Sequence, residues 1–394
     1  MLGIKRAFHI VEPGSDGVFR HAESLIAYQL EFGLNVGLAY SSVRGSDRLQ
    51  ELIRLVARAD GPVCDLRVGS SPNLFDLIAF SRALACIRSF RPEVIHCHSS
   101  KAGILGRAAA VLAGVPAVYT PNAYYGMGKQ AGARTALFNG LERLFAGLGH
   151  TVNVSEDEAV FARQRLGVRP TRQSVVPNSV DTGVFKPALA EEKKRSRLAK
   201  SLPADAVIVG TLGRLSYQKD PLTLYRAFEL FARRRPDVYL AHLGTGELAR
   251  DCNEWIQQSG LSSRILRIEY SPEPSEFYRA LDAFVLSSRY EGLSFAVLEA
   301  LATDLPLVLT DVPGNRDFLR LGLSHVWSAP AEDPDALAVA MEACLLDLEN
   351  GRPSNHRAVA LERFSEEVCF GRILDLYRQI VTSKRKQHSF AFSA

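Results

Sequence analysis

AVIVGTLGRLSYQKDPLTLYRAFELFARRR, residues 206–235, is the stretch that decides the predicted fold. Residues 206–212 form a continuous apolar run, which is typical of a strand that helices cover on both faces. Residues 222–235 repeat apolar side chains at helical spacing, and the polar residues between the two segments mark a loop. A strand, a loop and a helix in this order form the repeating unit of a parallel sheet.

The same alternation of apolar runs and helix-period segments continues along the whole chain. It predicts strands at residues 6–11, 36–41, 63–68, 94–98, 117–120, 151–154, 206–212, 238–243, 265–269, 283–287, 306–310 and 325–327. It predicts helices at residues 19–32, 73–90, 101–113, 134–147, 222–235, 294–303 and 335–348. Strand and helix alternate in both halves, so we expect an α/β protein with two Rossmann-like, doubly wound parallel sheets.

The length of 394 residues is sufficient for two domains of ordinary size. Prolines, glycines and a charged stretch mark a seam near residues 180–204. We expect a first domain at residues 1–180, a second at residues 181–364, and a final helix and tail at residues 365–394 that need not belong to the second sheet.

Composition limits the function classes. The hydrophobic fraction of 47% and the charged fraction of 23% are typical of a soluble globular protein. A net charge of +4 permits attraction to phosphates or to an anionic membrane surface, but it gives no reason to expect nucleic acid as a partner. No apolar run is long enough to span a membrane, and no signal peptide is visible. We therefore expect a cytoplasmic protein.

Cysteine and histidine patterns do not predict a metal or a disulfide. The six cysteines show no CxxC pair and no disulfide-like spacing, which indicates reduced thiols. On a strand, His96 and His98 would share a face while Cys97 points away. Two ligands do not make a metal site, so we expect none there.

Two loops that follow strands carry anion-binding signals. In EPGSDGVFRH, residues 12–21, glycines permit close backbone approach, and the N–H groups of the following helix favour an anion. The alternative is an ordinary tight turn. In GRLSYQKDP, residues 213–221, Arg214 and Lys219 suit a diphosphate at a strand end. The alternative is a pair of solvent-facing cations.

A third loop, SSRYEGLSFAVLE at residues 287–299, brackets a helix start with two carboxylates. Ser294 is a candidate N-cap. Glu291 belongs to the loop, whereas Glu299 is the only charge in the apolar run 293–302. A carboxylate that accepts two hydrogen bonds recognises a vicinal diol, such as that of a ribose or a hexose. The alternatives are a loop charge for Glu291 and a structural salt bridge for Glu299.

Six motifs together resemble one family. They are PGSDGVFRH (13–21), HCHSSKAG (96–103), VVPNSVDTGVFKP (175–187), GRLSYQKD (213–220), HLGTGE (242–247) and EGLSFAVLEALATDLPLVLTDVPGNRD (291–317). In this order they resemble the retaining glycosyltransferases of family 4. The resemblance implies the GT-B fold, with two Rossmann-like domains facing across a cleft and a C-terminal helix crossing back to the first domain.

The resemblance also implies roles for single residues. Arg214 and Lys219 would neutralise the leaving diphosphate, and Glu291 would hold the transferred sugar; these three form the predicted catalytic group. The other residues implied in donor binding are Gly17, Asn122, Gly213, Gly292, Leu293, Ser294, Phe295 and Glu299, the last of which would bind the ribose. Asp181 would support the hinge. Asn122 stands where many family members have histidine, and an amide cannot become charged.

The implied activity is a hexosyltransferase that moves a hexose from a UDP- or GDP-linked sugar to a lipid-linked or growing saccharide in exopolysaccharide or lipopolysaccharide biosynthesis. Such an enzyme retains anomeric configuration and uses no metal or other cofactor. Helix-period segments at residues 46–59 and 133–150 are candidates for peripheral contact with the inner membrane, or for core packing. The alternatives in function are a GT-B enzyme with a soluble acceptor, such as a disaccharide synthase or a nucleotide-sugar epimerase, and a non-catalytic nucleotide-sugar binding module.

Overall fold

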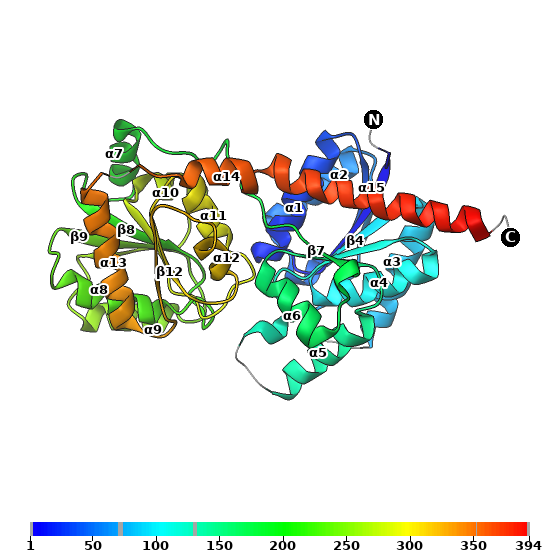
Figure 1. Ribbon diagram of the computed structural model, residues 1–394, viewed down its shortest axis with the longest axis horizontal. Helices are drawn as coiled ribbons and strands as arrows, with labels where there is room; N and C mark the ends of the chain where they lie inside the picture. The colour runs from blue at the N-terminus through cyan, green and yellow to red at the C-terminus, as the bar shows by residue number, and fades with distance from the viewer. Residues whose placement is uncertain (1–2, 70–73, 129–131, 352, 392–394) are drawn as a thin grey trace. The chain divides into compact units, whose positions relative to one another are not determined.

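The chain folds into two compact units in the computed structural model, which describes residues 3–69, 74–128, 132–351 and 353–391. The first unit combines Met1–Pro177 with Cys369–Ala394, and the second consists of Asn178–Val368. In each unit a twisted sheet lies between layers of helices (Figure 1). The predicted α/β class with two Rossmann-like parallel sheets is confirmed.

The first unit has a parallel sheet with the strand order β3-β2-β1-β4-β5-β6-β7. Its strands are β1 (Arg6–Val11), β2 (Asn35–Tyr40), β3 (Val63–Asp65), β4 (Val94–His98), β5 (Ala117–Thr120), β6 (His150–Asn153) and β7 (Gln173–Val175). Its helices are α1 (Asp16–Glu31), α2 (Asp47–Arg58), α3 (Phe75–Phe90), α4 (Ser100–Ala113), α5 (Ala133–Phe145), α6 (Glu156–Leu166) and most of α15 (Glu366–Ala391). The strand β7 was not predicted, because three residues of mixed polarity carry no strand pattern. Asn73, the first residue of one predicted helix, lies outside the described residues.

The second unit has a parallel sheet with the order β10-β9-β8-β11-β12-β13. Its strands are β8 (Val207–Leu212), β9 (Val238–Leu243), β10 (Ile265–Ile268), β11 (Ala283–Leu286), β12 (Leu307–Thr310) and β13 (Val326–Ala329). Its helices are α7 (Ala190–Ala199), α8 (Pro221–Ala232), α9 (Ala249–Gln258), α10 (Pro274–Ala280), α11 (Phe295–Ala302), α12 (Asn315–Leu319), α13 (Pro334–Glu349) and α14 (His356–Phe364). Both sheets thus place their first strand in the centre, next to their fourth.

This strand order creates a switch point in each sheet, where the chain leaves the first and the fourth strand toward opposite sides. In the first unit the switch point lies between β1 and β4, and in the second it lies between β8 and β11. Ligands of doubly wound sheets bind beyond the carboxyl ends of the strands at such points. The loops after these four strands are therefore where a site is expected.

The C-terminal helix α15 is part of the core of the first unit. Its apolar residues pack with those of α1 and α2 on one face of the sheet, and the buried members from α15 include Cys369, Phe370, Ile373 and Tyr377. The opposite face is covered by α3, α4 and α6. In Figure 1 the red helix α15 runs alongside α1 and α2. Burial of its apolar side chains, rather than intrinsic helix propensity alone, therefore stabilises α15.

The units divide at Pro177/Asn178 and at Val368/Cys369, rather than at the predicted residues 180/181 and 364/365. The reason lies in hydrogen bonds around Val180. The side-chain amide of Asn178 donates to the Leu293 carbonyl at 3.0 Å, and the Val180 backbone N–H donates to the Phe364 carbonyl at 2.8 Å. These bonds attach residues 178–180 to the second unit.

Helix length and hydropathy decide whether a helix could cross a membrane. Within the described ranges, no helix is both long enough and apolar enough to cross a bilayer. All six cysteines are free thiols, and four of them are buried.

Candidate functional site

The switch point of the second unit joins two of the three loops identified in the sequence. The loop after β8 contains Lys219 and the loop after β11 contains Glu291. The Ser287 hydroxyl donates to the carbonyl oxygens of Lys219 and Asp220, at 3.0 and 2.9 Å. The Gln218 amide donates to the Tyr290 carbonyl at 3.0 Å. The two loops therefore form one continuous surface at the carboxyl edge of the sheet.

Lys219 and Glu291 are in direct contact. The Lys219 ammonium donates to Glu291 Oε1 at 2.6 Å, and the Ser288 hydroxyl donates to the same oxygen at 2.5 Å. Glu291 is only 5% exposed, so it is not a solvated loop charge. The strands β8 and β11 are neighbours, which brings together two residues that lie far apart in sequence. The site thus holds one cation and one carboxylate in a fixed position.

Glycines allow the surrounding loops to approach closely. A side chain at Gly314, where φ is +84°, would meet the Glu291 and Gly292 carbonyl oxygens at 2.7 and 2.6 Å. A side chain at Gly246 would meet the Leu215 carbonyl oxygen at 2.4 Å. Only glycine fits such contacts. These positions set the path of the backbone that carries Glu291.

Arg214 and Gly213 lie at the start of the same surface. Arg214 is exposed, while a β-carbon on Gly213 would stand 3.5 Å from the aliphatic part of Lys219. The buried His242 contacts the Gly213 carbonyl through Nε2 at 3.3 Å and the Tyr225 hydroxyl through Nδ1 at 2.9 Å. Burial, with a smaller effect of Arg267, lowers the pKa of His242 to about 3, so it supports the loop as a neutral ring.

The helix α11 begins directly after this loop. Ser294 occupies its N-cap position, as predicted, but its side chain makes no capping hydrogen bond. The Ser294 hydroxyl oxygen is buried and has no hydrogen-bond partner among the described residues. Ser294 therefore does not cap the first turn of α11, whose positive dipole end favours an anion.

Glu299 lies inside α11 and is 1% exposed. Its Oε2 accepts a hydrogen bond from the Tyr278 hydroxyl of α10 at 2.6 Å. The same hydroxyl also contacts the Ala296 carbonyl at 3.1 Å.

Asp181 makes local hydrogen bonds, because its Oδ1 accepts from the N–H groups of Gly183 and Val184.

In the first unit, Gly17 lies in the first turn of α1 and is exposed. Gly14, just before it, donates its N–H to the Arg44 carbonyl at 3.1 Å, and a β-carbon there would come within 2.6 Å of the same oxygen. Glu12, at the end of β1, is buried beside the Arg44 guanidinium at 3.3 Å. Desolvation outweighs the attraction of Arg44 and raises the pKa of Glu12.

Asn122 follows β5 in an unusual state. Its φ of 53° is left-handed, and the next residue, Ala123, has a φ of 80°. The carboxylate of Glu158 holds this turn by accepting from the Ala123 N–H and, at 2.8 Å, from the Val154 N–H. Both polar atoms of the Asn122 amide are buried without a hydrogen-bond partner among the described residues. Buried amides usually make hydrogen bonds, so both polar atoms of the Asn122 amide have the capacity to bond to a ligand.

A histidine cluster is the feature that the sequence did not predict. His9 on β1 joins His96 and His98 on β4, and ring nitrogens of all three lie within 4.8 Å of one another. His9 contacts His98 at 3.0 Å and Gln29 at 2.9 Å. Burial lowers the pKa of His9 to about 4 and those of His96 and His98 well below 6.5. The neutral rings form part of a hydrogen-bonded chain inside the core.

The second unit thus gathers most of the predicted residues. Those on its adjoining loops and helix start are Gly213, Arg214, Lys219, Glu291, Gly292, Leu293, Ser294, Phe295 and Glu299. Gly17 and Asn122 belong to the first unit. Sequence reasoning missed the supporting contacts of Ser288, Tyr278 and Asn178. Hydroxyl and amide side chains near a motif carry no pattern that identifies their partners.

Comparison with known proteins identifies the family. The family described as Glycosyltransferase Family 4 matches residues 15–184, and the family described as Glycosyl transferases group 1 matches residues 192–358. The chain is 30% identical, over 67% of its length and 72% of the relative, to the Escherichia coli UDP-Gal:alpha-D-GlcNAc-diphosphoundecaprenol alpha-1,3-galactosyltransferase.

Two further proteins are similar. The Rhizobium meliloti lipopolysaccharide core biosynthesis glycosyltransferase LpsE is 28% identical over 58% of this chain and 71% of its own length. The crystal structure of Anabaena Alr3699/HepE in complex with UDP-glucose matches with a TM-score of 0.77 at 18% identity, over 96% of this chain and 99% of that chain. The last match concerns the fold alone. On these grounds the chain belongs to the glycosyltransferases, with a family 4 segment followed by a group 1 segment in a GT-B type fold.

Proposed function

We propose that the protein transfers a hexose from a UDP- or GDP-linked sugar to a lipid-linked or growing saccharide, with retention of anomeric configuration. The observation that carries the proposal is the contact of 2.6 Å between Lys219 and Glu291 at the switch point of the second sheet. A cation beside a carboxylate at this edge suits a ligand that has both phosphates and sugar hydroxyls.

Each residue of this surface has a chemical task in the proposal. Arg214 and Lys219 neutralise the diphosphate as it leaves, because negative charge develops there in the transition state. Lys219 is then drawn from Glu291 toward phosphate, while Glu291 accepts hydrogen bonds from the transferred sugar. The backbone at residues 292–295, which leads into the N-terminus of α11, favours the same phosphate.

Further residues of each unit have contacts with the donor in the proposal. Glu299 accepts hydrogen bonds from the ribose hydroxyls, and Tyr278 orients its carboxylate. Gly17 offers a backbone without a side chain to the diphosphate, and Asn122 binds the donor sugar. The Asn122 amide, whose two polar atoms have no hydrogen-bond partner within the described part of the chain, supports that assignment.

The cationic loop supports transfer without a metal ion. Arg214 and Lys219 place two positive charges where other transferases use a divalent cation. We expect turnover to continue at an unchanged rate in excess EDTA. A loss of turnover that added Mg²⁺ or Mn²⁺ restores would contradict this part of the proposal.

The acceptor and the location follow from relatives and from surface residues. The E. coli relative is named for a diphosphoundecaprenol acceptor. On α5, Leu137 and Leu144 are 54% and 73% exposed, and the loop after α5 exposes Leu148. This row of apolar side chains supports peripheral contact of a cytoplasmic enzyme with the inner membrane.

The test is transfer of a radiolabelled hexose from UDP- and GDP-sugars to lipid extract by the purified full chain. A labelled lipid-soluble product supports the proposal, and proton NMR of the released saccharide reports the anomer. A free disaccharide would favour a soluble acceptor instead. No turnover with any common UDP- or GDP-hexose would refute the proposal.

A further inference from the structure

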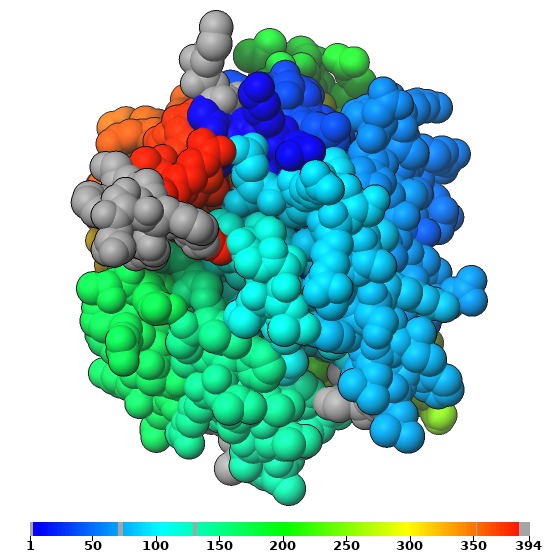
Figure 2. Space-filling view, turned by 90° about the vertical axis from the view of Figure 1, so that its right-hand side faces the viewer, coloured from blue at the N-terminus to red at the C-terminus, as the bar shows by residue number. Residues whose placement is uncertain are grey.

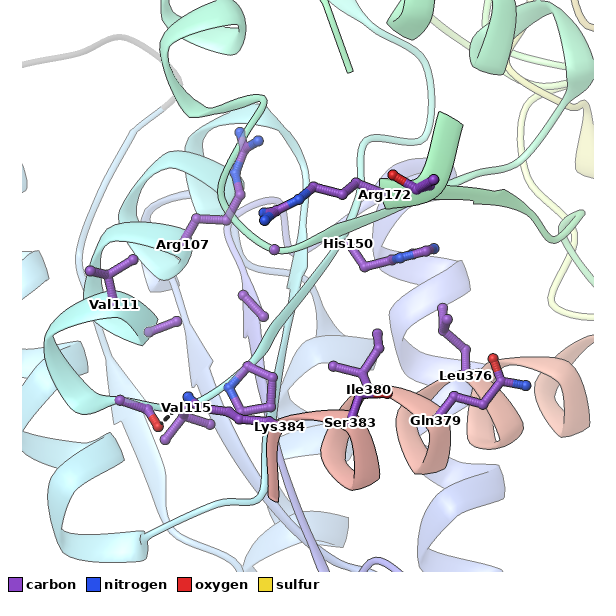
Figure 3. A pocket seen from close by; sticks show the side chains of 16 residues that line it. Arg107, Val111, Val115, His150, Arg172, Leu376, Gln379, Ile380, Ser383 and Lys384 are labelled. Atoms are coloured by element: carbon purple, nitrogen blue, oxygen red, sulfur yellow. Dashed lines mark hydrogen bonds between the residues drawn. The ribbon is translucent and has the colours of Figure 1, made fainter. Parts of the chain in front are cut away.

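A pocket of about 760 Å³ lies in the first unit, between α4 and α15, where Ala117 and His150 begin β5 and β6. The surface is hollowed where the red end of α15 borders the cyan and green segments (Figure 2). Figure 3 shows the lining side chains, among which Lys384 donates to the Gly114 carbonyl at 2.6 Å. This pocket lies at the amino-terminal edge of its sheet, whereas the transfer loops follow the carboxyl ends of their strands. The buried polar groups that bear on transfer therefore lie elsewhere.

A chain of buried hydrogen bonds leads to Glu291 from the interior of the second unit. The side-chain amide of Asn315, at the start of α12, donates to the Thr310 carbonyl at 3.1 Å. The Thr310 hydroxyl, at the end of β12, donates to the Ser288 carbonyl at 2.6 Å. The Ser288 hydroxyl then donates to Glu291 Oε1 at 2.5 Å. Asn315, Thr310 and Ser288 are 0% exposed, so water does not compete for these bonds.

The backbone around Ser288 is fixed as well. The Arg289 N–H donates to the Gln218 carbonyl at 2.8 Å, and the Glu291 N–H donates to the Pro313 carbonyl at 3.0 Å. Loops after three neighbouring strands, β8, β11 and β12, are therefore joined at this point. The Ser288 hydroxyl is presented to Glu291 from a single position.

Glu291 Oε1 thus has two donors, and they differ in their freedom to leave. The Lys219 side chain is 21% exposed and carries its ammonium on a flexible stem. In the proposed function Lys219 exchanges Glu291 for the diphosphate. Ser288 has no exposed surface and stays in place. Ser288 is then the donor that still holds the carboxylate when the sugar arrives.

We propose that Ser288 is a positioning residue, which keeps the Glu291 carboxylate oriented toward the transferred sugar while Lys219 binds the diphosphate. Ser288 contacts no reacting atom and acts through Glu291. A carboxylate held by one fixed donor presents its remaining lone pairs to sugar hydroxyls in a single orientation. The inference rests on the proposed function, because it requires that Glu291 receives the sugar.

The experiment separates the sugar from the rest of the donor. Calorimetric titration of the full chain compares a nucleoside diphosphate, UDP or GDP, with the corresponding nucleotide hexose. Ser288→Ala removes the donor, and Glu291→Ala and the double variant complete a mutant cycle. The control is Ser259→Ala, because the Ser259 hydroxyl donates to the Ile256 carbonyl at 2.9 Å at the end of α9.

We expect Ser288→Ala to bind the nucleotide hexose about five- to tenfold more weakly than wild type, as when a hydrogen bond to a charged group is lost. Its affinity for the nucleoside diphosphate should be unchanged, because only the sugar meets Glu291. In the Glu291→Ala background, the same substitution should change the affinity for the nucleotide hexose by less than about twofold, because Ser288 acts through Glu291. The Ser259→Ala control should bind both ligands like wild type.

Unchanged affinity of Ser288→Ala for the nucleotide hexose would overturn the proposal. Equal weakening for both ligands, or an equal effect in both backgrounds, would show a merely structural role and overturn it too. A wild type that binds a nucleotide hexose without turning it over contradicts the proposed transfer alone, and the affinities still decide the role of Ser288. A wild type that binds no nucleotide hexose overturns both. If Ser288→Ala does not fold, Ser288→Cys takes its place, because a thiol is a weak donor.

Discussion

At the residue scale, two positions carry most of the proposed chemistry, and they differ in kind. Lys219 is bonded within the protein, to Glu291, and has to exchange that partner for a phosphate. The Asn122 amide is buried without a protein partner among the described residues. Substitution of the first changes protein and ligand contacts together, whereas substitution of the second changes the ligand contact alone.

Replacing Lys219 by methionine keeps the length of the side chain and removes its charge. We expect kcat/KM to fall, because the transition state should lose roughly 2–4 kcal/mol of stabilisation, as when one preorganised charge donor is lost. Steady-state kinetics with the preferred nucleotide sugar measure this. Arg250→Met serves as the control, because its guanidinium is 86% exposed and pairs only at the surface of α9. Equal kinetics of the two variants would contradict the site.

Replacing Asn122 by glycine keeps the left-handed backbone accessible and removes the amide. The amide makes no hydrogen bond to the described residues, so the melting temperature should stay within about one or two degrees of wild type. This corresponds to a change on the order of a few tenths of a kcal/mol in the free energy of unfolding. We expect donor binding to weaken by about 1–3 kcal/mol, the usual cost of losing a buried hydrogen bond. Thermal denaturation and calorimetric titration with the donor check the two halves. Unchanged affinity would exclude Asn122 from the donor site.

At the element scale, the C-terminal helix α15 completes a polar chain inside the first unit. The Tyr377 hydroxyl contacts His96 Nδ1 at 2.6 Å and accepts from the Gln29 amide at 3.4 Å, and His96 Nε2 contacts Thr120 at 2.7 Å. Every member is buried. A buried polar chain stabilises the fold only when its members are satisfied, so α15 supplies a group that the sheet needs.

Tyr377→Phe removes that hydroxyl without creating a large cavity. His96 Nδ1 and the Gln29 amide then lose their partner, and the free energy of unfolding should fall by roughly 1–3 kcal/mol. Urea denaturation followed by circular dichroism measures the loss. Tyr270→Phe is the control, because Tyr270 is 79% exposed and such surface changes cost about 0.5 kcal/mol or less. Equal stabilities of both variants would show that the chain is not stabilising.

At the scale of the whole molecule, buried neutral histidines couple stability to pH. Burial lowers the pKa of His9 to about 4 and of His242 to about 3, and those of His96 and His98 lie well below 6.5. Below the unfolded-state pKa of about 6.5, these histidines bind protons in the unfolded chain but stay neutral in the folded chain. Acidification therefore destabilises the fold between about pH 6.5 and pH 4. The raised pKa of Glu12 opposes this in part.

The two units should respond differently, because three of these histidines belong to the first unit and His242 belongs to the second. Each such histidine lowers stability by up to about 1.4 kcal/mol per pH unit. Both tryptophans, Trp255 and Trp327, lie in the second unit. In urea titrations from about pH 7 to about pH 5, circular dichroism should therefore show a steeper loss of stability than tryptophan fluorescence. Parallel curves, or no pH dependence, would contradict this.

The sequence by itself determined most of the strands and the chemistry on single loops. Apolar runs and glycine-marked turns identified strands such as β4, β5 and β9 to the residue, because a covered parallel strand needs a continuous apolar stretch. The cationic loop after β8 and the carboxylate loop before α11 were likewise visible, since each motif is contiguous in the chain. The short β7 was not visible, because tertiary pairing rather than its own pattern makes it a strand.

Only the tertiary structure decided which residues meet. Lys219 contacts Glu291 because β8 and β11 are neighbours in the sheet, and His9 contacts His98 because β1 and β4 are neighbours. It also decided that Glu299 binds the Tyr278 hydroxyl and that α15 supplies Tyr377 to the first core. Local periodicity records which face of an element is buried, but contacts across long sequence separations depend on strand order, which no short stretch encodes.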